Sequence, residues 1–212
     1  MRINLPNQIT IGRLFMAIIF FSCLGRYDAR AAEPKLWLLD LCAGLFLVAA
    51  ITDVIDGYLA RKHNQVTSFG RVIDPFVDKV LVIGAYAFLA GDGFVDAAGR
   101  KISDVAMWMV VVIFGRELLV TSLRGVSEAG GQAFGADVYG KMKMLLQVIT
   151  VMWVLISLAH PGLGFPGTFI GVLCDRGRPV MVYLTVVVTL LSMGSYLWRA
   201  RAVLTHTSVA TR

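Results

Sequence analysis

The sequence is poor in charged residues and in cysteine, and both shortages narrow the kinds of protein that it can encode. Only 16% of the 212 residues are Asp, Glu, Lys or Arg, whereas 57% are hydrophobic. A soluble domain has about 25% charged residues, so this composition excludes an ordinary soluble protein. The three cysteines lie in or near apolar stretches and form no CxxC pair. Neither a disulfide framework nor a thiolate metal site is therefore expected.

Long apolar stretches take the place of the missing charge. A helix that crosses a bilayer needs about 20 mostly apolar residues, and six such segments can be placed along the chain. They are roughly 9–25, 36–60, 71–91, 104–124, 141–159 and 179–198. The connecting segments are too short to bury cores of their own. We therefore predict an all-α polytopic integral membrane protein with six transmembrane helices in one bundle.

This bundle is predicted to form a single membrane-embedded domain over residues 1–212, beginning with a short interfacial segment at 1–13. The Gly- and Pro-containing segment 160–178 is predicted to be a loop or a re-entrant turn.

Positive charge is spread along the loop ends rather than gathered into a stripe. The net charge of +6 therefore suits an anionic membrane surface or an anionic substrate better than nucleic acid. With six spans both termini lie on one side, together with 11 Lys and Arg residues against 7 on the other. Because Lys and Arg favour the cytoplasmic side, we expect both termini and the turn at 61–71 to face the cytoplasm.

Four aspartates interrupt the apolar pattern near the two ends of the second and third predicted helices that flank their connecting turn. Asp53 and Asp56 share one stripe of the second helix, and Asp74 and Asp78 share one stripe of the third. If the helices fold back antiparallel, Asp56 comes level with Asp74, and Asp53 with Asp78. Four adjacent carboxylates need positive charge between them. Carboxylate oxygens without an intervening amine are preferred by hard divalent cations, and two ions could form the clamp used in phosphoryl transfer.

Small residues lie on the same stripes as the aspartates. Gly57, Ala60 and Gly70 remove side-chain bulk there, which leaves room for a ligand. The alternative is close packing of helices in lipid. The aspartates themselves could instead pair with Lys and Arg side chains in the headgroup region.

The spacing of these residues resembles the signature of the CDP-alcohol phosphatidyltransferase family. The pattern Asp53-x-x-Asp56-Gly57-x-x-Ala60-Arg61, then eight residues, then Gly70-x-x-x-Asp74-x-x-x-Asp78 matches every position and gap. The resemblance implies a six-helix membrane enzyme, usually a homodimer. With the distribution of Lys and Arg, we expect it in a bacterial-type inner membrane with its active site facing the cytoplasm.

The same resemblance assigns roles to these residues. It implies that Asp53, Asp56, Asp74 and Asp78 hold two divalent cations, Mg²⁺ or Mn²⁺, and that Asp78 is also the general base. The residues implied to lie against the cytidine diphosphate part of a lipid donor are Asp53, Asp56, Gly57, Ala60, Arg61 and Gly70.

Cations in the later helices bear on the second substrate, the acceptor. Arg116 lies well inside an apolar span, where an arginine usually faces a polar cavity. With Arg124 and Lys141 it would suit an acceptor that carries a phosphate. Arg124 could instead pair with Glu117, and Lys141 could mark the membrane border. For Lys143 we prefer the border interpretation.

Three further stretches, NLPNQITIGR, RELLVTSLR and GKMK, resemble the family members that transfer a phosphatidyl group from CDP-diacylglycerol to glycerol 3-phosphate. This similarity spans residues 4 to about 150. Met144 departs from it, because those members commonly have Thr there. Asn7, Thr10 and Arg13 lie at helical spacing near the headgroup border, where they could line the same cavity or tether an interfacial helix.

Two other functions stay open at this point. One is the same chemistry with another acceptor, namely inositol phosphate, serine or phosphatidylglycerol, although a phosphate-free acceptor would leave Arg116 without a task. The other is a divalent-cation channel or transporter that uses the aspartates as a binding ring. A channel needs carboxylates along a path through the membrane, whereas these four gather at one face.

Overall fold

The computed structural model describes residues 5–62, 68–129, 138–161 and 169–207. Several predictions concern side chains that fall outside the described residues. The residues concerned, whose side chains or surroundings are not described, are Asn7, Thr10, Asp56, Gly57, Ala60, Arg61, Gly70, Asp74 and Lys141.

Six α-helices make up most of the described chain, and no β-strand occurs within the described ranges. The helices are α1 (Leu5–Leu24), α2 (Leu36–Lys62), α3 (Ser68–Leu89), α4 (Met107–Ala129), α5 (Val138–Ala159) and α6 (Phe169–Thr207). A short 3-10 helix, η1 (Asp92–Phe94), follows α3. The prediction of an all-α chain is therefore confirmed.

Three of these helices contain a stretch that is long and apolar enough to cross a membrane. The stretches are Leu36–Ile55, Met142–Ala159 and Cys174–Trp198, and α1 contributes a shorter apolar run, Ile11–Leu24. The apolar helices mark the chain as a membrane protein. Six crossings stay a prediction.

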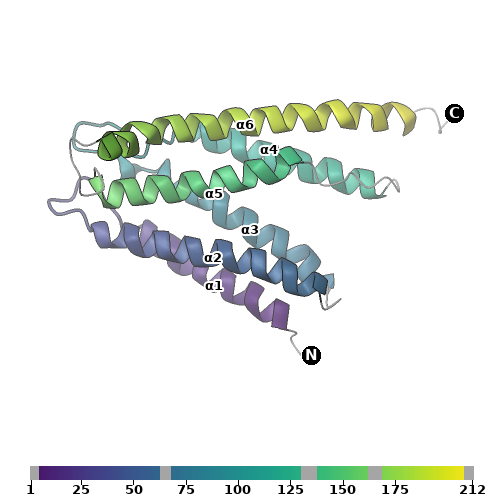
Figure 1. Ribbon diagram of the computed structural model, residues 1–212, viewed down its shortest axis with the longest axis horizontal. Helices are drawn as coiled ribbons and strands as arrows, with labels where there is room; N and C mark the ends of the chain where they lie inside the picture. Colours follow the sequence, from purple (N-terminus) through teal and green to yellow (C-terminus); the bar gives the residue numbers. More distant parts are fainter. Residues whose placement is uncertain (1–4, 63–67, 130–137, 162–168, 208–212) are drawn as a thin grey trace.

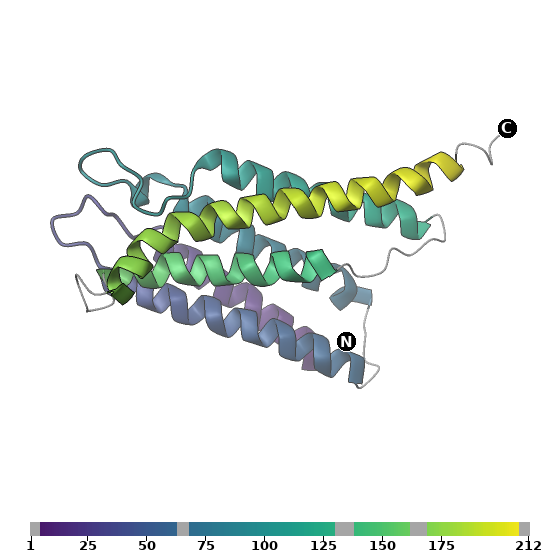
Figure 2. The same ribbon diagram turned by 45° about the horizontal axis from the view of Figure 1, so that its top comes forward.

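The helices alternate in direction along one long axis, and both termini lie at the same end of the bundle (Figure 1). α1 packs against α2, and α4 packs against α6. α3 contacts α1, α4 and α5, while α5 contacts α2 and α6, so these two helices join the two sides. The two sides diverge toward the end that carries the termini (Figures 1 and 2).

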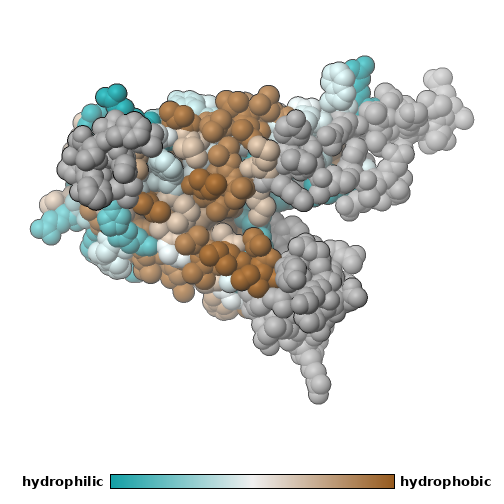
Figure 3. All heavy atoms as spheres, viewed as in Figure 1, coloured by the Kyte–Doolittle hydropathy of each residue, from teal (hydrophilic) through white to brown (hydrophobic). Residues whose placement is uncertain are grey.

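The outer surface of the bundle is apolar over its middle. Hydrophobic residues cover the centre of the face seen in Figure 3, and hydrophilic residues gather at the end away from the termini. Large apolar side chains such as Leu47, Val111 and Leu191 are exposed on the bundle. An exposed apolar belt of this kind suits a surface that faces lipid tails.

A small residue lets α1 and α3 approach closely. A Cβ atom at Gly84 of α3 would overlap the ring of Phe21 of α1. That ring also stacks on Phe88, with 5.4 Å between the ring centroids. Close approach at a glycine is how helices pack tightly in lipid, and here it holds α3 in the middle of the bundle.

The part of the segment 160–178 that begins at residue 169 differs from its prediction as a loop or re-entrant turn, and residues 162–168 lie outside the described part of the chain. Residues 169–178 form the first turns of α6, which runs on through Pro179. A proline inside a helix removes one hydrogen bond and bends the helix without necessarily ending it, and α6 curves near its beginning (Figure 2). Arg178 also fixes this part of α6, because its Nε donates to Asp104 Oδ2 at 2.6 Å.

The N-terminal residues also continue into a longer helix. Residues 5–13, expected as part of an interfacial segment, form the first turns of α1. As a result, Arg13 lies inside the bundle with only 1% of its surface exposed.

Candidate functional site

Asp53 of α2 and Asp78 of α3 lie on the wall of one cavity, together with Arg13 of α1. The guanidinium of Arg13 forms an ion pair with Asp53. A buried arginine needs an opposite charge beside it, and Asp53 supplies that charge. The spacing of the aspartates suggested carboxylates with no intervening Lys or Arg side chain, and the position of Arg13 corrects this for Asp53.

The rest of this cavity is apolar. Its volume is about 460 Å³, and its wall is formed mostly by α2 side chains such as Leu47 and Ile51 and by Leu145 and Val148 of α5. A second apolar cavity of about 470 Å³ shares Leu47, Leu145 and Val148 and extends to Trp153. A continuous apolar surface therefore leads away from the two carboxylates along α2 and α5. We call these two cavities together the apolar groove.

A smaller and charged cavity lies on the other side of Asp78, and we call it the cationic cavity. Its volume is about 260 Å³, and α3, α4, α5 and α6 all contribute to its wall. The charged side chains that line it are Lys79, Arg116, Arg124, Lys143, Asp78 and Glu117. Four cations face two carboxylates, so the described lining has an excess of two positive charges.

Glu117 organises the cations of this cavity. Its Oε1 accepts a hydrogen bond from Arg116 Nη1 at 3.0 Å and forms an ion pair with Lys143. Lys143 is only 5% exposed, so its interpretation as a residue of the membrane border is wrong. The suggested pair between Arg124 and Glu117 is also absent among the described side chains, since Glu117 pairs with Arg116 and Lys143 instead.

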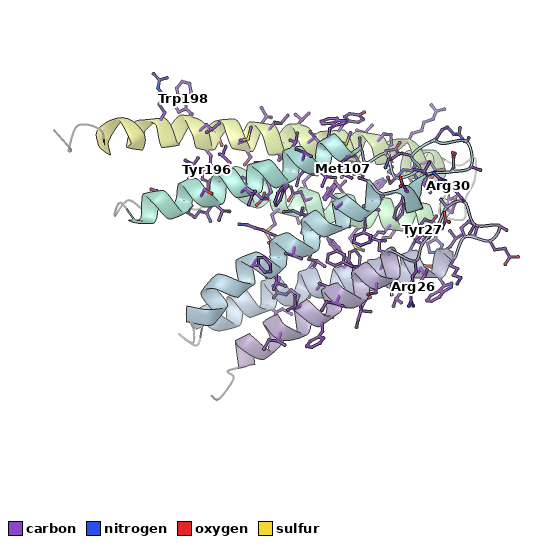
Figure 4. The ribbon with its side chains drawn as sticks, turned by 180° about the vertical axis from the view of Figure 1, so that it is seen from behind. Arg26, Tyr27, Arg30, Met107, Tyr196 and Trp198 are labelled. Carbon is purple, nitrogen blue, oxygen red and sulfur yellow. The ribbon has the colours of Figure 1, made fainter. Side chains whose placement is uncertain are left out.

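Two polar residues of α6 hold the arginines in place. Arg116 Nη2 donates to Ser192 Oγ at 2.6 Å, and Arg124 Nη2 donates to the Tyr196 hydroxyl at 2.8 Å. The ring of Tyr196 also lies 5.8 Å from the guanidinium carbon of Arg116, within the range of a cation–π contact. Figure 4 shows Tyr196 on the side of α6 that faces α4, whereas Trp198 points outward.

One N–H group of Arg116 is not used in these contacts. Its side chain is 5% exposed, and its Nε has no hydrogen-bond partner among the described residues. A buried N–H without a partner is costly. A ligand oxygen in the cationic cavity would satisfy it.

Three side chains form the wall between the apolar groove and the cationic cavity. Asp78, Val82 and Met144 line both. The carboxyl group of Asp78 can therefore be approached from an apolar side and from a charged side. Met144, which departs from the pattern expected of its subgroup, stands in this wall.

The carboxylates suit a divalent metal by their chemistry. Asp53 and Asp78 offer hard oxygen ligands from two antiparallel helices that border one cavity. The other two predicted ligands, Asp56 and Asp74, have side chains outside the described residues. Within the described part of the chain, no group of three or more metal-binding side chains occurs.

Sequence reasoning missed the contributions of Ser192, Tyr196 and Gln147. All three are polar residues in apolar helices, which is a signal of an internal polar site. Ser192 and Tyr196 are also four residues apart, so they share one face of α6. Their partners on α4 are more than 70 residues away in the sequence, and the spacing on one helix does not reveal them.

Comparison with known proteins identifies relatives over most of the chain. The sequence profile described as CDP-alcohol phosphatidyltransferase matches residues 3–198. The chain is 35% identical to CDP-diacylglycerol--glycerol-3-phosphate 3-phosphatidyltransferase of Bacillus subtilis over 192 residues, which cover 87% of this chain and 90% of the relative. The protein of the same name from Sodalis glossinidius is 30% identical and covers 95% of this chain and 97% of its own length.

A third relative carries a different name. The probable phosphatidylglycerophosphate synthase of Mycobacterium tuberculosis is 32% identical over 160 residues, which cover 74% of this chain and 68% of the relative.

Proposed function

The chain belongs to the CDP-alcohol phosphatidyltransferase family, and we propose that it transfers a phosphatidyl group from CDP-diacylglycerol to glycerol 3-phosphate. The products are phosphatidylglycerophosphate and CMP. The observation that carries this proposal is the position of Asp78, between an apolar groove and a cavity with two excess positive charges. The lipid donor has apolar chains, which match the groove, and the small phosphorylated acceptor is anionic, which matches the positively charged cavity.

The apolar groove suits the donor. The diacylglycerol chains of the donor need apolar surface next to the reacting phosphates, and the groove runs from Asp53 and Asp78 along α2 and α5. The cytidine diphosphate would lie against Asp53, Asp56, Gly57, Ala60, Arg61 and Gly70. Asn7, Thr10 and Arg13 would line the same end of the site.

The cationic cavity suits the acceptor. A phosphate monoester carries about two negative charges at neutral pH, which matches the two excess positive charges of the described lining. Arg116 and Arg124 would bind the phosphate, with Lys141 from the start of α5, and Lys143 joins them because it is buried in the same cavity. The cavity volume of about 260 Å³ is below the range of about 300–1,000 Å³ for drug-sized ligands, so it favours a small acceptor.

Asp78 is the proposed general base. An alcohol is a weak nucleophile at neutral pH and needs a base within hydrogen-bond reach. Asp78 takes the proton from the acceptor hydroxyl, and the hydroxyl oxygen forms a bond to the phosphorus that carries the diacylglycerol. The bond between that phosphorus and the bridging oxygen of the pyrophosphate breaks, and CMP leaves with the electron pair.

Two divalent cations, Mg²⁺ or Mn²⁺, are the proposed cofactors. The residues that would hold them are Asp53, Asp56, Asp74 and Asp78. When bound, such ions neutralise the pyrophosphate oxygens and the charge that develops on the departing CMP. Arg13, through its ion pair with Asp53, holds that carboxylate in position toward the cavity.

We place the protein in a bacterial-type inner membrane as a homodimer, with the active site and both termini in the cytoplasm. The common end of the two termini (Figure 1) and the distribution of Lys and Arg support this orientation. Homodimers are expected from the family resemblance.

The first prediction concerns the reaction itself. The purified protein in detergent, given CDP-diacylglycerol and Mg²⁺ or Mn²⁺, is expected to release CMP when glycerol 3-phosphate is added. Inositol phosphate, serine and phosphatidylglycerol should not replace it. Asp78→Asn should lower the rate by at least about a hundredfold, because general-base catalysis contributes about 10²–10⁴. Addition of EDTA should stop the reaction, and excess Mg²⁺ should restore it.

Other outcomes would redirect the proposal. Turnover with another acceptor would move the chain to a different branch of the same family. Uptake of Mn²⁺ into vesicles that contain the protein, without CMP release under any condition, would favour the channel or transporter.

A further inference from the structure

Gln147 of α5 is buried in the wall of the cationic cavity and has an unused hydrogen-bond donor. The residue is 3% exposed and lines this cavity together with Asp78, Arg116 and Lys143. Its side-chain Nε2 has no hydrogen-bond partner among the described residues. Gln147 is thus a polar side chain at the proposed acceptor site that has no assigned task.

The backbone around Gln147 is held firmly. The Tyr86 hydroxyl of α3 donates to the backbone carbonyl of Gln147 at 3.3 Å. One helical turn earlier, Lys143 is ion-paired to Glu117. These contacts fix α5 against α3 and α4 at this level, so the amide cannot reach solvent by a small shift of the helix.

A buried amide N–H without a partner lowers stability, and the large majority of such groups in proteins are paired. An oxygen atom of a ligand in the cavity is the natural partner for Gln147 Nε2. Neither carboxylate of the cavity, Asp78 or Glu117, accepts a hydrogen bond from Gln147 Nε2. Arg116, Arg124 and Lys143 cannot do so, because they are themselves donors.

We propose that Gln147 donates a hydrogen bond to the hydroxyl of the acceptor that does not react, and that it selects acceptors carrying this hydroxyl. The inference rests on the proposed function, in which the cations bind the phosphate and Asp78 receives the proton of the reacting hydroxyl. Glycerol 3-phosphate has one further hydroxyl, on the carbon between these two ends. Gln147 lines the same cavity as Asp78 and the cations. Its Nε2 can donate a hydrogen bond that this hydroxyl accepts.

Such a contact gives specificity because the N–H of Gln147 stays unpaired when an acceptor without this hydroxyl is bound. A site built to bind a hydroxyl rejects a substrate without it, because the buried donor then loses its partner. The matched probe is 3-hydroxypropyl phosphate, which keeps the phosphate and the reacting hydroxyl and lacks only the middle hydroxyl.

The experiment compares kcat/KM for glycerol 3-phosphate and 3-hydroxypropyl phosphate in the CMP-release assay. The unaltered protein should prefer glycerol 3-phosphate by at least about tenfold. Gln147→Met keeps the length of the side chain and removes its polar atoms. This variant should lose most of the preference, through a lower kcat/KM for glycerol 3-phosphate and little change for the probe.

Thr150→Val serves as the control on the next turn of the same helix. Thr150 is fully buried and contacts Thr185 Oγ1 at 2.7 Å, but it does not line the cationic cavity. Any loss of packing in this control should affect both acceptors equally and leave their ratio unchanged.

A second measurement does not depend on turnover. Glycerol 3-phosphate should raise the thermal midpoint of the unaltered protein more than 3-hydroxypropyl phosphate does, and Gln147→Met should remove the difference. Equal use of both acceptors by the unaltered protein, or an unchanged preference in Gln147→Met, would overturn the role of Gln147 while leaving the proposed reaction intact. Absence of CMP release with glycerol 3-phosphate would instead overturn the proposed function.

Discussion

At the scale of single residues, Glu117 determines how the positive charges of the cationic cavity are held. Its side chain is 13% exposed and is paired with the buried side chains of Arg116 and Lys143. Buried charges of this kind are tolerated because they are paired. Removal of one partner leaves the others in a place where they are poorly solvated.

The arrangement around Glu117 makes Lys143→Met a double test, of stability and of acceptor binding. Because Glu117 loses one of its two cations and keeps Arg116, the free energy of unfolding should fall by about 1.5–3 kcal/mol, the contribution of one charged hydrogen bond. The loss of a cation from the cavity should also raise KM for glycerol 3-phosphate at least about tenfold, since the phosphate loses a charged hydrogen bond of about 1.5–3 kcal/mol. Chemical denaturation in detergent measures the first effect, and the CMP-release assay measures the second.

The double variant Lys143→Met with Glu117→Gln separates the two effects. Neutralising Glu117 also deprives Arg116 of its carboxylate, so the free energy of unfolding should fall further than in Lys143→Met, because a buried cation is left unpaired. KM should stay about as high as in Lys143→Met, because the phosphate lacks Lys143 in both variants. A double variant with normal KM would contradict a role for Lys143 in acceptor binding and leave it a purely structural one.

At the scale of elements, α6 acts as the support of the cationic cavity. Ser192 and Tyr196 lie one turn apart and hold arginines that belong to α4. The aspartates of the proposed donor site belong to α2 and α3 instead. Changes on α6 should therefore act on the acceptor and leave the donor unaffected.

We predict that Tyr196→Phe raises KM for glycerol 3-phosphate about fivefold and changes kcat little. The variant keeps the ring near Arg116 but removes the hydroxyl that accepts from Arg124, and a hydrogen bond to a charged group contributes about 1.5–3 kcal/mol. The KM for CDP-diacylglycerol should not change. Steady-state kinetics with each substrate varied in turn tests this.

Tyr183→Phe is the matched control, since Tyr183 lies on the same helix and is 54% exposed. It should behave as the unaltered protein. Equal effects of the two substitutions would show that α6 responds to the loss of any tyrosine hydroxyl and does not position Arg124.

The sequence predicted the positions of the helices better than the side-chain contacts between them. Apolar runs of sufficient length identify a helix locally, and the stripe of Asp53 and Asp56 depends on the geometry of one helix alone. The partners of Arg116 and Lys143 depend on how separate helices pack, which no local spacing contains. The predicted last span begins only at residue 179, because the Pro and Gly residues of 160–178 predicted a loop or re-entrant turn, whereas α6 begins earlier and continues through Pro179 with a bend.

At the scale of the whole molecule, the common end of the two termini makes the orientation testable. Arg30 lies in the loop at the opposite end of the bundle, as Figure 4 shows, whereas Arg201 lies near the C-terminal end of α6. Both are exposed. If the excess of Lys and Arg marks the cytoplasm, the two positions face opposite sides of the membrane.

We predict that a membrane-impermeant maleimide added to intact spheroplasts labels Arg30→Cys and spares Arg201→Cys until the membrane is permeabilised. The three native cysteines, Cys23, Cys42 and Cys174, are free and would first be replaced by alanine. Labelling of Arg201→Cys in intact spheroplasts would reverse the orientation and move the proposed active site to the outer face.

The thin partition made by Asp78, Val82 and Met144 has a consequence for the way in which the two reactants meet. One of them dissolves in oil and the other in water, and neither needs to leave its own phase. In the proposed reaction the boundary between the phases follows these three side chains, of which only Asp78 is polar, so the free-energy cost of carrying a doubly charged molecule into lipid does not arise.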